Sequence, residues 1–149
     1  MKMKPMLTVV VIATALLLAA CATPAQPASK AWVEVSCDEF YDDHHIDTRL
    51  EVQAGETFEV KVCSNPTTGF QWSETPENSD QTVLQQIAHE FIPPEDLAER
   101  PPPAGSPGKE VWTFKTLKKG TSTISFEYSR PWEGGEKGEW TCTVNVVVK

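Results

Sequence analysis

The sequence predicts an all-β fold and, within that class, a β-sandwich. Several short segments alternate apolar and polar residues, as strands with one buried face do. Gly, Pro, Asn and Asp residues mark turns between these segments, and no long segment has the 3.6-residue period of an amphipathic helix. The 149 residues, once an N-terminal leader is set aside, are enough for a single domain.

The N-terminus predicts an export signal followed by a lipid attachment site. Residues 1–20 begin with two lysines and continue in the uncharged apolar run 7–20, which is too short to span a membrane comfortably. The run ends in Leu18-Ala19-Ala20-Cys21, which resembles the lipobox of bacterial lipoproteins. That resemblance implies cleavage before Cys21 and lipidation of its sulfur. The alternative is an ordinary secretory signal that is cut nearby, with Cys21 incidental.

Residues 21–30 are small, polar and Pro-containing, and this composition predicts a flexible tether. In lipoproteins of double-membraned bacteria, a residue other than Asp after the lipidated cysteine implies sorting to the outer membrane, and here that residue is Ala22. A cysteine with several acyl chains anchors well, because anchoring strength grows with the number of buried CH₂ groups. We therefore expect a protein of the bacterial cell envelope, lipid-anchored in the outer membrane, with one folded domain over 31–149.

The charge of the chain excludes one class of partner. The formal net charge is −8, and it becomes −10 when Lys2 and Lys4 leave with a signal segment that has no acidic residue. An acidic surface repels phosphate backbones, so nucleic acid is not an expected partner.

Three cysteines remain in the predicted domain: Cys37, Cys63 and Cys142. In an oxidising compartment we expect two of them to pair and one to stay buried. Cys142 shares a strand face with three alternating valines, which favours a small core residue at that position. Cys37 and Cys63 lie at strand ends, where a bridge is easier to accommodate, so we favour the disulfide Cys37–Cys63.

Seven segments have the alternation of strands. The clearest is 57–62, with Phe58, Val60 and Val62 on one face and charged residues on the other. The seven are 32–37, 48–52, 57–62, 70–72, 109–116, 122–129 and 139–149. An eighth segment, 82–91, fits either a strand or a helical turn, and the all-β context favours the strand.

The longer connections are polar or rich in proline. Residues 38–47 form an acidic segment that predicts a loop or short turn, and 73–81 predicts a surface connection. Residues 92–108 contain six prolines, which excludes a central strand or a helix interior. A loop of this length in a compact domain is usually functional or disordered.

The sequence contains no catalytic or metal-binding motif that we can identify. It has no G-x-S-x-G elbow, no phosphate-binding glycine loop and no C-x-x-C pair. Adjacent His44 and His45 would point to opposite faces of an extended segment, so a solvated acidic loop is favoured over a metal site. A hydrolase would need a histidine near Ser106 or Cys142. We predict no enzyme activity, no metal and no cofactor.

Three rigid loops lie between predicted strands. The first combines Pro66, which fixes its own φ, with Gly69, which permits φ > 0. Each loop alone has an ordinary explanation as a turn, a linker or an edge contact. Each loop lies where the predicted sandwich turns at one end, and this shared placement favours a joint function. The three are Asn65-Pro66-Thr67-Thr68-Gly69-Phe70, the stretch that ends Gly105-Ser106-Pro107-Gly108, and Arg130-Pro131-Trp132.

In these three loops, and in Trp72 after the first, the sequence resembles the chagasin-type inhibitors of papain-like cysteine peptidases. The resemblance runs from about Val33 onward, and the middle loop departs from the family in being richer in Pro and poorer in Gly. It implies an immunoglobulin-like β-sandwich whose three loops, at one end, enter the peptidase cleft in reversible, tight binding. A papain-like cysteine peptidase is therefore the expected partner.

The resemblance also assigns roles to the loop residues. Thr67 and Thr68 would lie nearest the catalytic Cys and His of the peptidase. Trp132 would pack on the aromatic wall of the primed side, with Arg130 supporting its loop, and the middle loop would cover the non-primed side.

The alternative function is a cell-envelope module that binds carbohydrate or protein on an aromatic platform, without inhibitory activity. Trp72, Trp112, Trp132 and Trp140 are the candidate residues. Most of them alternate into strand faces, so core packing explains three of them better.

Overall fold

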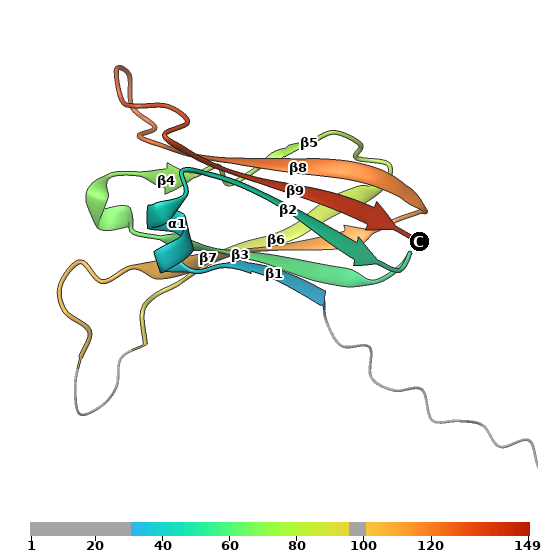
Figure 1. Ribbon diagram of the computed structural model, residues 1–149, viewed down its shortest axis with the longest axis horizontal. Helices are drawn as coiled ribbons and strands as arrows, with labels where there is room; N and C mark the ends of the chain where they lie inside the picture. The colour runs from blue at the N-terminus through green and yellow to red at the C-terminus, as the bar shows by residue number, and fades with distance from the viewer. Residues whose placement is uncertain (1–30, 96–100) are drawn as a thin grey trace, which may run out of the picture.

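The structure is a computed structural model that describes residues 31–95 and 101–149 (Figure 1). In these ranges the chain forms two β-sheets packed face to face, which confirms the predicted all-β, immunoglobulin-like sandwich. The expected signal segment 1–20 and the tether 21–30 with Cys21 lie outside the described residues. In the part of the chain that is described, no helix is long and apolar enough to cross a membrane.

Each sheet is built from strands that are not neighbours in sequence. In the first sheet the order is β1 (Ala31–Val35), β3 (Thr57–Ser64), β7 (Gly108–Thr116) and β6 (Leu84–Ile92). In the second sheet the order is β2 (His45–Val52), β9 (Trp140–Val148), β8 (Gly120–Ser129) and β4 (Gln71–Trp72), and β5 (Glu77–Asn78) also pairs with β8.

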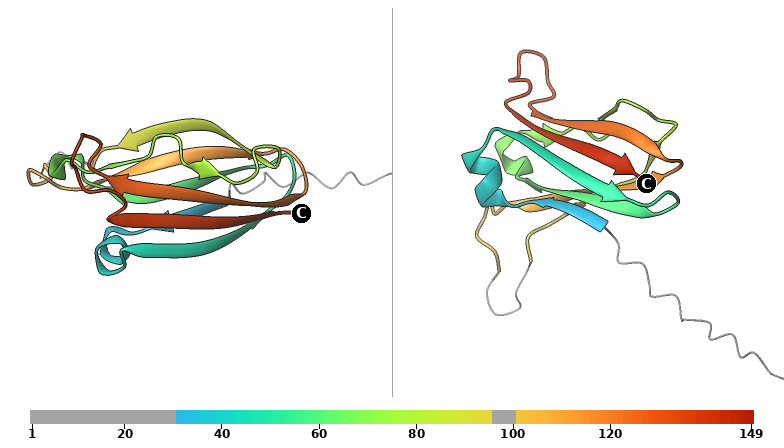
Figure 2. Two further views of the ribbon diagram at one scale, coloured as in Figure 1. Left: turned by 90° about the horizontal axis from the view of Figure 1, so that it is seen from above. Right: turned by 45° about the vertical axis from the view of Figure 1, so that its right-hand side comes forward.

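The strand directions bring four connections to one end of the sandwich. β1 runs parallel to β3, β2 runs parallel to β9, and the other pairs are antiparallel. The segment between β1 and β2 and the connections after β3, β6 and β8 therefore meet at the same end. Figures 1 and 2 show all four there, with the C-terminus at the opposite end.

The core lies between the sheets and follows the predicted alternation. Phe58 and Phe114 are directly opposite each other on β3 and β7, and their rings stack at 5.4 Å. Complete burial of such a side chain stabilises the fold by about 1.5–3 kcal/mol. Nearly all of the predicted inward residues are fully buried: Phe58, Val60, Val62, Trp112, Phe114, Ile124, Phe126, Tyr128, Cys142, Val144 and Val146.

The predicted loop at 38–47 is wrong over most of its length. Cys37–Asp42 forms the helix α1, and β2 already begins at His45 rather than at 48. The Ser36 side chain caps this helix by accepting a 3.2 Å hydrogen bond from the Glu39 amide. The helix also buries the Phe40 ring between the sheets. A capping-box pattern, Ser followed three residues later by Glu, was present in the sequence.

One other segment differs in detail from the prediction, and one ambiguous segment is settled. The surface connection at 73–81 contains the two-residue strand β5, which pairs with β8 at Ser125 and Ile124. The ambiguous segment 82–91 is the strand β6, as the all-β context favoured.

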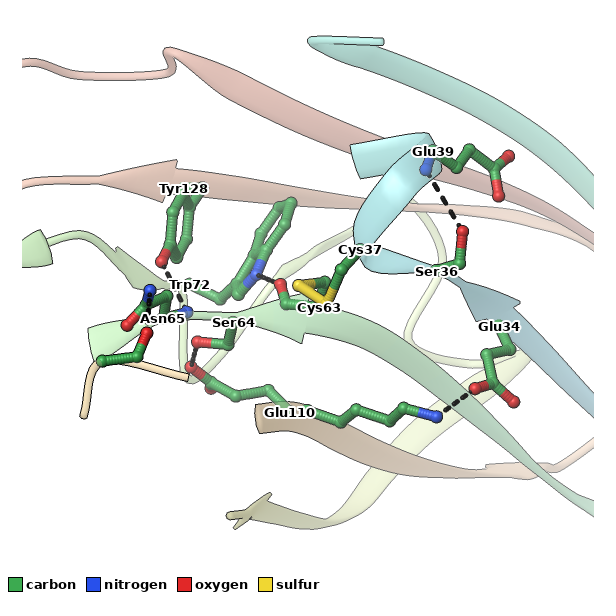
Figure 3. The surroundings of a disulfide bond; sticks show 12 residues. Glu34, Ser36, Cys37, Glu39, Cys63, Ser64, Asn65, Trp72, Glu110 and Tyr128 are labelled. Carbon is green, nitrogen blue, oxygen red and sulfur yellow. Dashed lines mark hydrogen bonds and ion pairs between the residues drawn. A yellow bond between two sulfur atoms is a disulfide. The ribbon is translucent and has the colours of Figure 1, made fainter. Parts of the chain in front are cut away.

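The disulfide Cys37–Cys63 is present, as predicted, and joins the start of α1 to the end of β3 (Figure 3). Its two Cα atoms are 4.9 Å apart. The bridge spans 26 residues, a separation for which chain entropy predicts about 3.5 kcal/mol of stabilisation. The Cys63 carbonyl also accepts a 2.9 Å hydrogen bond from Trp72 Nε1, so the bridge and a buried indole fix the same residue.

Cys142 is a free, fully buried cysteine, again as predicted. Burial in the core raises the pKa of its thiol from 9.0 to about 12. The folded state therefore retains this proton at a pH where the unfolded chain has released it. The contribution of Cys142 to stability is complete below about pH 9 and falls as the pH rises toward 12.

We expect Cys142 to be unreactive toward thiol reagents in the folded domain, because a buried neutral thiol is a poor nucleophile. Iodoacetamide treatment of residues 31–149, followed by mass spectrometry, should give no adduct in buffer at pH 8. One adduct is expected in denaturant without reductant. Rapid alkylation of the native domain would contradict the buried position.

Candidate functional site

Three connections at one end of the sandwich form the candidate site. Loop 1 (65–70) joins β3 to β4, loop 2 (93–107) joins β6 to β7, and loop 3 (130–139) joins β8 to β9. Loop 2 is described except for residues 96–100. The sequence-predicted loops thus lie together at one end, as Figure 1 shows.

Loop 1 is a single tight turn held by its own hydrogen bonds. Pro66–Thr68 forms a 3-10 helix whose N-cap is Asn65. The Asn65 Oδ1 atom accepts from the Thr67 amide at 3.3 Å and from the Thr67 hydroxyl at 2.6 Å. The Asn65 carbonyl accepts from the Thr68 hydroxyl at 2.7 Å. Both threonine hydroxyls therefore donate inside the loop, and their remaining lone pairs can accept hydrogen bonds from a partner.

Gly69 ends this turn in a conformation that favours glycine. Its φ is +82°, and its amide donates to the Pro66 carbonyl at 3.0 Å. A Cβ atom at Gly69 would lie 2.7 Å from Cη2 of Trp132 in loop 3. Gly69 is therefore required both by the left-handed turn and by the indole that packs against it.

The root of loop 1 is fixed to the second sheet. The Asn65 amide donates to the Tyr128 hydroxyl at 3.0 Å (Figure 3). Burial raises the pKa of Tyr128 above its usual value, so this hydroxyl stays neutral at physiological pH. The Phe70 ring stacks on Tyr128 at 5.4 Å and meets Trp140 edge-on at 5.3 Å.

Loop 2 approaches loop 1 through Gly105. Gly105 has a φ of +81°, and its carbonyl accepts a 2.9 Å hydrogen bond from Asn65 Nδ2. Next to it, the Ser106 amide and hydroxyl both donate to the Pro103 carbonyl, at 3.0 and 2.7 Å. The end of loop 2 is thus a closed turn in direct contact with loop 1.

Loop 3 folds back on itself around Arg130. The Arg130 side chain donates to Glu136 at 2.6 Å, and its backbone amide donates to the Glu136 carbonyl at 2.8 Å. Lys137 Nζ donates to the carbonyls of Arg130 and Trp132, and the Gly135 amide also donates to the Trp132 carbonyl at 3.1 Å. Hydrogen bonds therefore fix the backbone of loop 3 both before and after Trp132.

Arg130 also connects loop 3 to loop 1. Its guanidinium carbon lies 4.5 Å from the centre of the Phe70 ring and 5.9 Å from that of Trp132. It also donates a long hydrogen bond of 3.5 Å to the Thr68 carbonyl. Cation–π contacts of this kind contribute about 0.5–2 kcal/mol.

Loops 1 and 3 both present exposed side chains. Pro66, Thr67 and Thr68 are exposed on loop 1, and the Trp132 side chain is 52% exposed on loop 3. A large exposed aromatic ring held on a braced loop is a typical anchor for a protein partner.

The structure places two predicted contact residues beneath this surface. Phe70 is buried under loop 1 among aromatic rings. Gly108 is buried in β7, where a Cβ atom would lie 2.6 Å from the Phe91 ring. Both positions support the loops from below. The remaining predicted residues, Gly105, Ser106, Pro107, Arg130 and Pro131, lie on the loops themselves.

The sequence analysis missed a buried polar cluster below loops 1 and 2. Glu110 Oε1 accepts from the Ser64 hydroxyl at 2.9 Å, and Oε2 lies 2.6 Å from His89 Nε2. Glu110 shares the strand face of Trp112 and Phe114, so the alternation of β7 contained the signal for a buried acid. The carboxylate lies between the serine and the histidine, and Ser64 is fully buried, so this is no nucleophile–base pair.

The other two histidines have separate partners. The His44 ring packs at a tilt against Trp140, with 4.8 Å between ring centres, and lies 3.7 Å from Glu139, while His45 is hydrogen-bonded to Thr141 at 3.0 Å. Within residues 31–95 and 101–149 there is no group of three or more metal-ligating side chains. No described histidine contact involves Ser106 or Cys142, the pairs that a hydrolase would have needed.

A family model described as the chagasin family peptidase inhibitor I42 matches residues 51–146, which is most of the described sandwich. The chain belongs to the chagasin family. As a member of that family it is an inhibitor of papain-like cysteine peptidases and not an enzyme. Amoebiasin-2 of Entamoeba histolytica is 31% identical over 124 residues, covering 76% of this chain and 92% of the relative. Chagasin of Trypanosoma cruzi is 32% identical over 93 residues, covering 60% and 79%.

Two solved structures share the fold. The cysteine protease inhibitor EhICP2 of Entamoeba histolytica superimposes with a TM-score of 0.57 at 24% identity, covering 71% of this chain and 95% of that one. PbICP-C, solved in complex with falcipain-2, gives a TM-score of 0.54 at 14% identity, covering 80% and 100%. At these identities the likeness concerns the fold alone.

We expect Gly69→Ala to reduce papain inhibition strongly, because the added methyl group displaces the Trp132 indole. Gly55→Ala is the matched control, since Gly55 has a φ of +87° with no atom near its Cβ position. Both substitutions should lower the free energy of unfolding by about 1 kcal/mol. Only Gly69→Ala should raise the inhibition constant, and equal inhibition by the two variants would contradict the packing role.

Proposed function

We propose that this protein blocks papain-like cysteine peptidases by inserting loops 1, 2 and 3 together into the active-site cleft. The observation that carries the proposal is the direct bonding among the loops. Asn65 joins loop 1 to loop 2, and Arg130 joins loop 1 to loop 3, so the three form one preassembled surface. Preformed loops lose little conformational entropy on docking, which favours tight binding.

Loop 1 is suited to block a nucleophile without acting as a substrate. A substrate lies extended and presents a free carbonyl to the attacking thiolate. In loop 1 the carbonyls of Asn65 and Pro66 accept internal hydrogen bonds, and the Thr68 carbonyl faces Arg130. These three carbonyls are already engaged, so the turn presents threonine side chains to the catalytic residues instead of a scissile bond.

The flanking loops supply the larger contact area. Trp132 and Arg130 are of the residue types that dominate binding energy at protein interfaces. We assign Trp132 to the primed side of the cleft and the end of loop 2 to the non-primed side, as the motifs imply. An interface of about 1,600 Å² is typical of peptidase–inhibitor complexes.

We also propose that the domain is held at the bacterial cell envelope, in the outer membrane, by lipidation of Cys21. The support for this is the sequence Leu18-Ala19-Ala20-Cys21, followed by Ala22 and the Pro-containing segment that precedes β1. Mass spectrometry of the membrane fraction from a bacterial host tests the proposal. A Cys21-terminated chain carrying acyl groups is the expected product, and an unmodified secreted chain would contradict it.

No observation favours the alternative carbohydrate module. Trp72 and Trp112 are buried in the core, and Trp140 is partly buried, stacked on Phe40 and in contact with His44. Of the four candidate residues, only Trp132 is exposed. Among the described residues the other exposed tryptophan is Trp32, which lies on β1 rather than in a loop.

We expect Trp132→Ala to weaken inhibition of papain by at least about a hundredfold, the range of a central interface anchor. The fold should remain intact, because the side chain is half exposed. Trp32→Ala is the matched control, since Trp32 is 60% exposed outside the loops. Inhibition constants for the two variants of residues 31–149 decide the matter. An unchanged constant for Trp132→Ala would sink the proposal.

We expect Thr67→Ala combined with Thr68→Ala to affect binding more than stability. Loss of two exposed hydroxyl hydrogen bonds should lower the free energy of unfolding by only about 1–2 kcal/mol. The inhibition constant should rise by about tenfold or more as loop 1 loosens. The Thr67→Ser, Thr68→Ser variant keeps both hydroxyls and should retain inhibition. A larger change in melting temperature than in binding would argue for a purely structural role.

A further inference from the structure

Glu110 is an acidic residue on a strand face that otherwise packs into the core. It is 7% exposed and accepts hydrogen bonds from Ser64 on β3 and His89 on β6. Ser64 immediately precedes loop 1, and His89 lies three residues before β6 ends at loop 2. Figure 3 shows the bond from Ser64 to Glu110 beside the disulfide. The carboxylate thus joins the strands that lead into both loops.

β6 contains a β-bulge at Ile87, two residues before His89. Its pairing with β7 shifts by one residue between Gln86 and Ala88, which leaves Ile87 without a partner on β7. After the bulge His89 lies opposite Trp112, and the two rings stack at 4.7 Å. Phe91 lies opposite Glu110. Among the described strands β6 lies at the edge of its sheet and pairs with β7 alone.

A regular pairing without the bulge would exchange the two faces of the strand. It would place Ala88 opposite Trp112, turn His89 outward and put Glu90 opposite Glu110. A one-residue slip moves every later side chain to the other face. Two carboxylates would then meet on the core face, where like charges directly opposite each other are destabilising. In the observed pairing Glu90 is exposed on the outer face.

We propose that Glu110 selects the bulged register of β6 and so positions loop 2 against loop 1. It acts by attraction of His89 and by repulsion of Glu90. Glu110 is a positioning residue, because it is buried below the loops and acts through Ser64 and His89. The proposal rests on the proposed function in one respect, namely that the loops contact the peptidase together.

The contacts of loop 2 depend on this register. A slip of one residue displaces the β6 stem by about 3.3 Å along the strand. The Phe91 ring would leave its place against Gly108, where no Cβ atom fits. Gly108 follows Gly105 by three residues, so loss of this packing would loosen the end of loop 2, where the Gly105 carbonyl accepts the hydrogen bond from Asn65 Nδ2.

The test is Glu90→Lys in residues 31–149, which contain every described element. In the observed register this side chain is exposed, so the substitution alone removes no native contact that would weaken binding. In the slipped register it would face Glu110 and form an ion pair. We expect NMR cross-strand contacts to change from His89–Trp112 to Ala88–Trp112. We also expect the inhibition constant for papain to rise by about tenfold, which requires that about a tenth of molecules keep the observed register.

Two controls separate register from other effects. Glu77→Lys makes the same change in net charge on β5, and it should leave both readouts unchanged. Deletion of Ile87 makes the observed pairing of Ala88 with Thr113 the regular one. Combined with Glu90→Lys, that deletion should restore the His89–Trp112 contact and most of the inhibition.

Either of two results would overturn the proposal. In the first, Glu90→Lys keeps only the His89–Trp112 contact and inhibits like Glu77→Lys. In the second, its inhibition falls but deletion of Ile87 does not restore it. If the unmodified domain fails to inhibit papain, the proposed function fails instead. The NMR contacts still decide the register in that case, since they need no peptidase.

Discussion

The loop end of this sandwich depends on Asn65, whose four polar groups all form hydrogen bonds. Its amide donates to Tyr128 on the second sheet, and its side-chain nitrogen donates to Gly105 in loop 2. Its side-chain oxygen and its carbonyl accept from Thr67 and Thr68. One residue, through its backbone and its side chain, thus fixes the turn, attaches it to the core and couples it to the next loop. An aspartate has no amide N–H₂ group and would lose the bond to loop 2.

The second constraint is the contact of loop 1 with loop 3, which combines apolar and cation–π packing with one long hydrogen bond from Arg130 to the Thr68 carbonyl. Arg130 covers the Phe70 ring, and Trp132 lies against Gly69. The contact of Arg130 requires a ring at position 70, and the contact of Trp132 requires a residue without a Cβ atom at position 69. The same residues that shape loop 1 therefore place the exposed indole beside it. Rigidity of this kind lets a few exposed side chains bind tightly, because little order remains to be created on docking.

Much of this architecture could be predicted from the sequence, because strand alternation determines which face is buried. The parity of Cys142 and the predicted strand-end positions of Cys37 and Cys63 correctly separated the free thiol from the disulfide, although Cys37 begins α1 rather than ending a strand. The helix α1 was missed although its capping pattern was present, because six residues are too few to show a helical period and the helix depends on burial of Phe40, a tertiary contact. The bulge at Ile87 could not be predicted, since one extra residue in a strand produces no recognisable alternation pattern. Nor could a motif distinguish a contact residue from a supporting one such as Gly108.

The covalent and polar supports of loop 1 act on consecutive residues. Cys63 is held by the disulfide to α1 and by the Trp72 indole, and Ser64 is held by Glu110. The family match begins at residue 51, so Cys37 and α1 precede the matched residues. The bridge therefore ties an N-terminal segment outside the match to the strand that carries loop 1. β1 runs parallel to β3 and therefore ends at the same end of the sandwich, where loop 1 begins. The chain crosses from the first sheet to the second there, through α1. Cys37 lies at this crossing, so the disulfide forms next to the start of loop 1.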